Sequence, residues 1–189
     1  MTLSSQDQEV LNRLELFFER AFQIEEYNKD SNLSGSRQTT KGQTIKEFKY
    51  DYQYCQTAFT SEVSFGKGYI ADVLWFAFCA EGQKPQSGIF PEVLFNTKAE
   101  KPNHNVEVVY GTSVTGTPLV LWSDSIRTNI TNYPESSTKK YKTSRVKKAF
   151  TIHSMADFEI YQYDILEALH VVMKDFDEVM QKPAKMSVM

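Results

Sequence analysis

Residues 61–96 constrain the fold more than any other stretch, because they hold two short apolar runs separated by a polar connection. The runs, residues 73–80 and 89–95, are rich in aromatic and β-branched side chains, and turn-forming residues bound both of them. Short runs of this composition are typical of buried strands rather than of helices. We therefore predict two strands, preceded by a loop at residues 65–68 that contains two glycines.

Apolar periodicity predicts one helix near each end of the chain. Residues 6–26 and 157–181 place apolar side chains three and four positions apart, which is the helical period. Between them we predict strands at residues 45–59, 59–65, 106–111 and 149–153, and a short helix at residues 123–131. This order favours an α+β fold with a curved, mostly antiparallel β-sheet core. An N-terminal and a C-terminal amphipathic helix would pack on that sheet.

A chain of 189 residues is long enough for one domain with a substantial core. We expect residues 1–27 to form the N-terminal helix of this domain and residues 45–181 to form its core. Residues 28–44 are rich in Ser, Asn, Thr, Gly and Lys and have almost nothing to bury, which predicts a flexible loop or an insertion. Residues 182–189 are expected to be a tail or linker.

Several classes of protein fit the sequence poorly. No apolar run approaches the roughly 18 residues of a membrane span, and the polar N-terminus does not resemble a signal peptide. Cys79 lies within an apolar run, which predicts a buried, reduced thiol and fits a cytoplasmic protein without a membrane partner. Neither a phosphate-binding loop nor a zinc-ligand spacing is present, so we predict no cofactor and no catalysis. Glu47 and Lys49, with Asp30 as the upstream acid, match half of a nuclease site, a pattern that is common by chance.

The distribution of charge along the chain favours nucleic-acid binding, although the net charge does not. The net charge is −3, which argues against a nucleic-acid-binding protein. Residues 129–153, however, hold six basic residues against one acidic residue, and a local basic patch is what a phosphate backbone meets. A solvated charged face is the alternative interpretation. The candidate phosphate-binding residues are Lys139, Lys140, Lys142, Arg145, Lys147 and Lys148.

Aromatic residues form two patterns, and composition alone leaves the role of both open. Trp75 begins the run Trp75-Phe76-Ala77-Phe78, and a run of this kind in a strand is more often a packing element than a binding site. Tyr50, Tyr52 and Tyr54 alternate, so that they share one face of a strand. That face suits a platform for nucleic acid, and equally a side of the sheet that packs against the core.

An ordered series of short segments resembles a known family. The segments lie within residues 59–180 and follow one another with few gaps. They are Ser64-Phe65-Gly66-x-Gly68, Trp75-Phe76-Ala77-Phe78, Glu81-Gly82-Gln83, Gly88-Ile89-x-Pro91 with Leu94, Tyr110-Gly111-x-Ser113, Trp122, and Lys139-Lys140-Tyr141. Together they resemble the N-terminal DNA-binding domain of McrB, the specificity subunit of the McrBC modification-dependent restriction systems.

The resemblance implies a DNA-binding module that flips a modified cytosine out of the duplex into an aromatic pocket. It implies that Trp75, Phe90, Leu94 and Tyr141 line the base pocket. A loop with Phe65, Lys67 and Tyr69 would enter the DNA or its groove. The implied partners are double-stranded DNA carrying a modified base, a GTPase AAA+ module and a McrC-type nuclease subunit.

Two positions depart from the family pattern and leave the preferred base open. Position 67 is lysine and position 90 is phenylalanine, where the family has tyrosines. The candidate marks are 5-methylcytosine, 5-hydroxymethylcytosine, N4-methylcytosine and a methylated adenine. The alternative function is a nucleic-acid-binding domain that reads shape or single strands and has no preference for modified bases.

Overall fold

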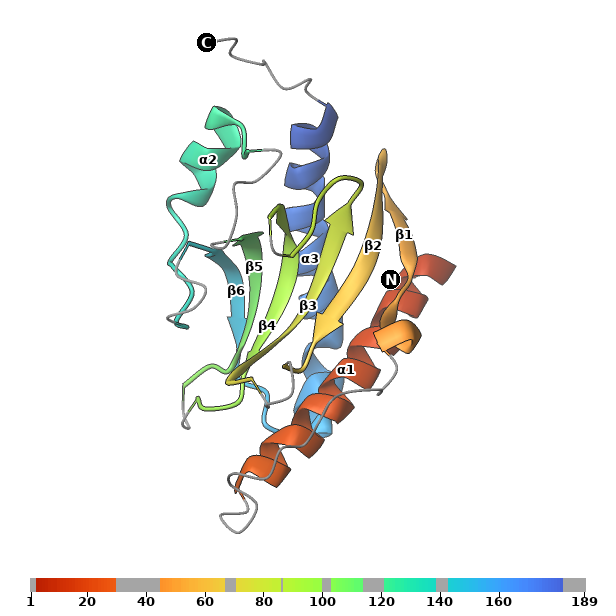
Figure 1. The fold of residues 1–189 in the computed structure, drawn as a ribbon, viewed down its shortest axis with the longest axis vertical. Coiled ribbons are helices and arrows are strands. Elements are labelled where there is room, and N and C mark those ends of the chain that lie inside the picture. The colour runs from red at the N-terminus through yellow and green to blue at the C-terminus, as the bar shows by residue number, and fades with distance from the viewer. Residues whose placement is uncertain are drawn as a thin grey trace.

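The computed structural model describes residues 3–29, 45–66, 71–85, 87–99, 103–113, 121–138 and 143–181. These residues form an antiparallel sheet in which the strands lie side by side in chain order (Figure 1). The strands are β1 (Asp51–Tyr54), β2 (Thr57–Ser64), β3 (Val73–Ala80), β4 (Ile89–Asn96), β5 (Val106–Thr112) and β6 (Arg145–Phe150). The predicted α+β class with its antiparallel sheet is confirmed.

Helices pack on one face of this sheet, which we call the helix face. They are α1 (Ser5–Lys29), α2 (Asp124–Ile130) and α3 (Met155–Gln181), and a short 3-10 helix, η1 (Ile45–Phe48), precedes β1. The rings of Phe18 and Phe158 stack with centroids 4.7 Å apart and join α1 to α3. Alternate residues of β3, from Leu74 to Ala80, belong to the same buried cluster as these two helices. The two amphipathic helices predicted near the ends of the sequence are therefore confirmed.

Serine caps set where the helices begin. At the start of α1, the Ser4 hydroxyl accepts a hydrogen bond from the backbone N–H of Asp7 at 3.1 Å, and the Asp7 carboxylate accepts one from the N–H of Ser4. Ser154 and Asp157 repeat this pair of contacts at the start of α3, where Asp157 reaches the N–H of His153. Such caps satisfy backbone donors that the first helical turn leaves without partners.

Two predicted strands differ from the structure by more than two residues at each end. Residues 45–59 contain η1, β1 and a hairpin turn, at which Cys55 has a positive φ of 52°. The last strand is Arg145–Phe150 rather than residues 149–153. Asn105 holds the segment after β6, because its side chain bonds both the N–H and the carbonyl of Ile152. The basic composition of residues 145–148 hid this strand, since it lacks an apolar alternation.

The predicted division into helix, loop, core and tail stays a prediction. Helix α1 continues to Lys29, two residues beyond the predicted end of the first segment. Residues 30–44 and the tail at 182–189 lie outside the described residues. Cys79 is a buried free thiol, as predicted, and Cys55 is an exposed one. None of the helices in the described ranges combines the length and the apolar character that crossing a bilayer requires.

Candidate functional site

The face of the sheet opposite the helices, which we call the far face, carries the residues of interest. Side chains alternate between the two faces of a strand, so Trp75, Ala77 and Cys79 of β3 point away from the helix face. They form two small clusters with residues of β4, β5 and β6, and no described helix contributes to either cluster. Residues of the far face include Glu62, Val73, Trp75, Ala77, Cys79, Phe90, Glu92, Leu94, Glu107, Val109, Gly111 and Val146.

Trp75 and Leu94 are direct cross-strand neighbours on the far face. They are paired across β3 and β4, and Leu94 is in turn paired with Glu107 of β5. Leu94 is 1% exposed, whereas Trp75 is only partly buried. Trp75 contacts both far-face clusters, one around Leu94 and Val109 and the other around Phe90. Three of the four residues predicted to line a base pocket therefore lie on one patch of the sheet.

Phe90 lies over Gly111, and this contact depends on the glycine. The two residues are paired across β4 and β5. A Cβ atom on Gly111 would lie 2.7 Å from the backbone oxygen of Phe90 and 2.9 Å from a carbon of its ring. Both distances are shorter than van der Waals contact allows, so the close approach of Phe90 to β5 requires a glycine at position 111.

Glu92 lies between Phe90 and Leu94 on the far face of β4 and is 2% exposed. Across the sheet it is paired with Ala77 on one side and Val109 on the other. Burial, together with the charges of Glu62 and Glu92, raises the pKa of the Cys79 thiol, so this thiol stays protonated and acts as an apolar group.

Glu107 is the second buried carboxylate of the far face, at 3% exposure. Its oxygens accept hydrogen bonds from the Ser136 hydroxyl at 2.6 Å and from the Ser137 N–H at 3.0 Å. His104 Nε2 lies 3.2 Å from the same carboxylate. Glu107 therefore ties residues 136 and 137 to β5, beside the patch around Trp75.

Six of the predicted site residues lie outside the described part of the chain. They are Lys67, Tyr69, Lys139, Lys140, Tyr141 and Lys142. The residues on both sides of 139–142 are attached to the sheet. Thr138 N–H bonds the Ser136 hydroxyl, and the Thr143 hydroxyl bonds the carbonyl of Thr112 at the end of β5.

Phe65, predicted to enter the DNA or its groove, has a packing role in the structure. Its ring is 9% exposed and lies in the helix-face core. The ring centroids of Phe17 and Phe48 are 5.6 Å and 5.5 Å away. Insertion of Phe65 into DNA would remove a large apolar side chain from these contacts, which stabilise the core by about 1.5–3 kcal/mol per side chain.

The described members of the predicted phosphate-binding set all have protein partners. Lys148 pairs with Asp164 of α3 at 3.1 Å, and Arg145 pairs with Glu135 at 3.4 Å. The Lys147 ammonium donates to the Tyr133 hydroxyl at 2.7 Å and lies over its ring. Exposed ion pairs contribute about 0–1 kcal/mol, so a phosphate could replace Asp164 at small cost. Glu135 is the one acidic residue that the sequence places in residues 129–153, and folding adds Asp164 of α3.

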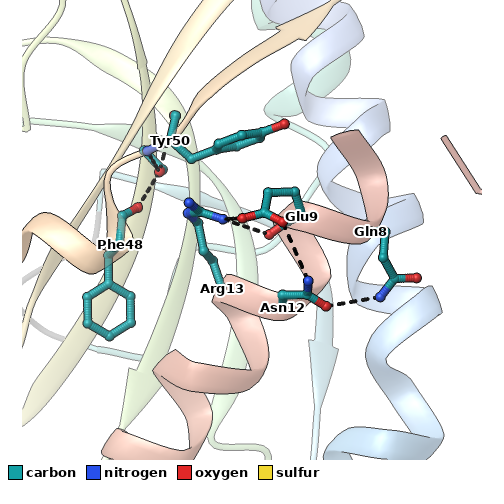
Figure 2. Close-up of polar contacts among 7 residues, drawn as sticks. Gln8, Glu9, Asn12, Arg13, Phe48 and Tyr50 are labelled. Atoms are coloured by element: carbon teal, nitrogen blue, oxygen red, sulfur yellow. Dashed lines mark hydrogen bonds and ion pairs between the residues drawn. The ribbon is translucent and has the colours of Figure 1, made fainter. Parts of the chain in front are cut away.

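The three alternating tyrosines do not form an exposed platform. Tyr52 is 2% exposed, and Tyr50 and Tyr54 pack against the core. Arg13 of α1 lies 4.4 Å from the centre of the Tyr50 ring. Figure 2 shows Arg13 beside Tyr50, held by its contacts with Glu9. The core-facing interpretation of these tyrosines is therefore the correct one.

Tyr52 belongs to a polar cluster between α1, β1 and α3. Its hydroxyl lies 2.7 Å from Asp7 Oδ1 and 2.7 Å from His170 Nε2. Burial opposes the charge on Asp7, but hydrogen bonds from Tyr52 and Ser4 outweigh it and lower the pKa of this carboxyl. Burial also lowers the pKa of His170, against the attraction of Asp7, so the ring is neutral at pH 7. This cluster joins the two long helices to the sheet.

No group of three acidic, histidine or cysteine side chains suited to a metal ion occurs among the described residues. The half-motif of Glu47 and Lys49 lies at the end of η1, and its proposed upstream acid, Asp30, lies outside the described part. The sequence pattern did not indicate that Glu92 and Gly111 belong to the site. A signal existed for Glu92, because it is the one charged residue within an otherwise apolar run.

The fold and the site define a sheet with helices on one face and an aromatic patch on the other. No model of a known protein family matches the chain. The chain is similar to the type IV methyl-directed restriction enzyme EcoKMcrB subunit of Escherichia coli (strain K12), with 29% identity over 106 residues. The match covers 55% of this chain and 21% of that subunit, so the chain corresponds to about a fifth of its relative. The resemblance to McrB drawn from the ordered segments is thereby confirmed.

Proposed function

We propose that this protein is the DNA-reading part of a modification-dependent restriction system and that it binds a modified base flipped out of duplex DNA. The observation that carries the proposal is that Trp75, Phe90 and Leu94 lie together on the far face of β3 and β4. The similarity to a McrB subunit, a methyl-directed restriction protein, supports the same function. A modified cytosine, above all 5-methylcytosine, is the proposed mark.

Each of the three side chains has a role that follows from its exposure. Trp75 retains exposed surface and offers its ring to the base, since stacking on an aromatic ring contributes about 1–3 kcal/mol per base. Phe90 and Leu94 are 3% and 1% exposed and form the apolar floor next to the base. Unstacking a base costs a few kcal/mol, so stacking and flipping nearly cancel and small contacts decide which base is bound.

A methyl group on the base supplies part of the preference. Burial of one methyl group against Leu94 or Phe90 contributes about 0.8 kcal/mol, which is about fourfold in affinity. The shape of the floor and the lower flipping cost of particular base pairs supply the remainder. In the full system, we propose that a GTPase AAA+ module and a McrC-type nuclease subunit act on the DNA that this part selects.

Fluorescence anisotropy with matched duplexes tests the proposal. The probes share one sequence and one salt concentration, and differ only in the modification of a single purine–cytosine step. We expect one modified duplex to bind more tightly than the plain duplex, and this preference to disappear in Trp75→Leu. Equal affinity of the wild type for all duplexes would contradict base reading and favour a nonspecific binder.

Trp122→Phe is the matched control for Trp75→Leu. Trp122 is 7% exposed and packs on the helix face against Tyr110 and Phe176. Its buried Nε1 donates to no acceptor among the described residues, so phenylalanine removes no hydrogen bond seen there. We expect Trp122→Phe to keep the preference. It also leaves Trp75 as the remaining tryptophan of two, whose fluorescence should be quenched by the preferred duplex.

The shape- or single-strand-reading alternative loses its main support. That interpretation needed Tyr50, Tyr52 and Tyr54 on a free surface, and all three pack on the helix face. Single-stranded probes in the same titration test it directly. Binding to them as tight as to the modified duplex would restore the alternative.

A further inference from the structure

Two carboxylates are buried on the far face, and only one of them is surrounded by the proposed base pocket. Glu92 and Glu107 are 2% and 3% exposed. Glu107 is paired with Leu94 across β4 and β5, accepts hydrogen bonds from Ser136 and Ser137, and contacts His104.

The neighbours of Glu92 in the sheet are the residues of the proposed pocket. Phe90 and Leu94 precede and follow it by two positions on β4, so all three side chains leave the same face. Ala77 is directly opposite on β3, which makes Trp75 a diagonal neighbour. Diagonal neighbours on one face lie about 7–8 Å apart, within reach of an aromatic side chain. Ala77 has the smallest side chain of the far-face residues Trp75, Ala77 and Cys79 of β3.

A carboxylate at this position distinguishes bases by what they carry on the pairing edge. A flipped base is read through hydrogen bonds to that edge. Cytosine and adenine carry an exocyclic amino group that donates hydrogen bonds, whereas thymine carries a carbonyl oxygen at the corresponding carbon. An ionised carboxylate only accepts hydrogen bonds, so it binds the amino group and repels the carbonyl oxygen.

We propose that Glu92 accepts a hydrogen bond from the exocyclic amino group of the flipped base and so selects amino-bearing bases against thymine. This inference rests on the proposed function, because it assigns Glu92 to the pocket of Trp75, Phe90 and Leu94. The apolar floor responds to the methyl group, and Glu92 responds to the amino group, so that 5-methylcytosine meets both requirements and thymine, which has the same methyl group, meets only one.

The test compares 5-methylcytosine with thymine at the same position of one duplex, each opposite guanine. These two bases differ at carbon 4 and the adjacent ring nitrogen and keep the same methyl group. We expect the wild type to prefer the 5-methylcytosine duplex by about 5- to 150-fold, the range that a good base contact supplies. In Glu92→Gln, whose amide can also donate to a carbonyl, this ratio should fall to near one or reverse.

Glu107→Gln and Glu62→Gln are the matched controls. Glu107 is about as buried as Glu92 on the same face, and its carboxylate holds residues 136 and 137. Glu62 lies opposite Ala77 on the β2 side, so its substitution removes a neighbouring charge without changing Glu92. Both variants should keep the wild-type ratio. A thymine–guanine mismatch flips more easily than a correct pair, but this advantage is the same for every variant and cancels between them.

A second measurement needs no variant and covers the case in which Glu92→Gln does not fold. A duplex containing 5-methylpyrimidin-2-one in place of 5-methylcytosine lacks the exocyclic amino group and keeps the methyl group. Both probes place the test base opposite an abasic site, so that no base pair is broken on flipping, and the wild type should bind the 5-methylpyrimidin-2-one duplex about 5- to 150-fold more weakly than the 5-methylcytosine duplex. Equal binding of these two probes would overturn the inference.

The outcomes separate this inference from the proposed function. If the wild type prefers the 5-methylcytosine duplex over the plain one and folded Glu92→Gln keeps the wild-type ratio to thymine, the proposed function stands and the role of Glu92 is refuted. If the wild type shows no preference for any modified duplex, both are refuted together. Loss of the ratio in Glu107→Gln as well as in Glu92→Gln would also contradict the assignment, because it would trace the effect to the fold of the far face.

Discussion

Substitution of Gly111 by alanine tests whether the floor of the proposed pocket is built as the structure indicates. The added Cβ would lie 2.7 Å from the backbone oxygen of Phe90 and 2.9 Å and 3.0 Å from two carbons of its ring. All three contacts are too short, and the first involves the backbone of the paired strand, which cannot rotate away as a side chain can. Strand β5 must therefore move from β4, or the ring of Phe90 must tilt off β5.

The expected cost follows from this crowding. Overpacking of a well-packed site destabilises a protein by about 1–3 kcal/mol. For a chain of this length, 1 kcal/mol corresponds to about 2–4 °C in Tm, so we expect Gly111→Ala to lower Tm by about 2–12 °C. Binding should fall as well, because Phe90 is displaced from the floor, and the preference for the modified duplex should fall more than binding to the plain duplex.

Thermal unfolding followed by circular dichroism, and anisotropy titrations well below Tm, measure the two effects. Phe90→Leu combined with Gly111→Ala serves as the control. Leucine at position 90 removes the two ring contacts and leaves the contact with the backbone oxygen of that position. The loss of stability in the double variant should therefore be smaller than the sum of the losses in Gly111→Ala and Phe90→Leu. An unchanged or raised Tm in Gly111→Ala would refute the close approach of Phe90 to β5.

Three further predictions concern other parts of the molecule. Lys147→Ala and Lys148→Ala should each weaken all duplexes alike and reduce the salt dependence of binding by about one counterion, and a change confined to the modified duplex would contradict a phosphate role. Burial lowers the pKa of His170 below its usual 6.5, so the unfolded chain binds the proton more readily than the folded chain does. The free energy of unfolding should therefore fall as the pH drops below about 6.5, and it should fall less in His170→Gln. Denaturant unfolding of both proteins at pH 7 and pH 5 measures this difference. The pKa of Asp7 is lowered from 3.8, so its carboxylate should stabilise the fold above pH 4 and lose this effect as the pH falls through the folded-state pKa. Asp7→Asn should therefore be less stable than the wild type at pH 7. A difference in Tm that persisted at pH 2 would argue against this role.

Periodicity in the sequence located most of the elements. Strand β3 has the predicted bounds, and β4 extends the predicted run by one residue, because short apolar runs bounded by turn residues have few other ways to be buried. The two long helices follow from apolar residues spaced three and four apart. Strand β6 was misplaced, since its basic residues carry no such alternation and it is recognised only by its pairing with β5.

The partial prediction of the candidate site has a similar explanation. The resemblance to McrB selected Trp75, Phe90 and Leu94, and strand pairing brings these three together on the far face. The same resemblance selected Phe65, whose ring the fold places against Phe17 and Phe48 in the core. The matching segments indicate which residues are shared with the family, but they do not indicate on which face of the sheet each side chain lies.

The sequence by itself determined the α+β class, the positions of the apolar strands and the amphipathic character of α1 and α3, because these depend on neighbours a few residues apart. Only the tertiary structure decided that Tyr52 meets Asp7 and His170, that Lys148 meets Asp164, and that two carboxylates are buried beside the aromatic patch. Asp7 and Tyr52 are 45 residues apart, and Tyr52 and His170 are 118 apart. Contacts across such separations depend on strand register and on how the helices dock, and local periodicity encodes neither.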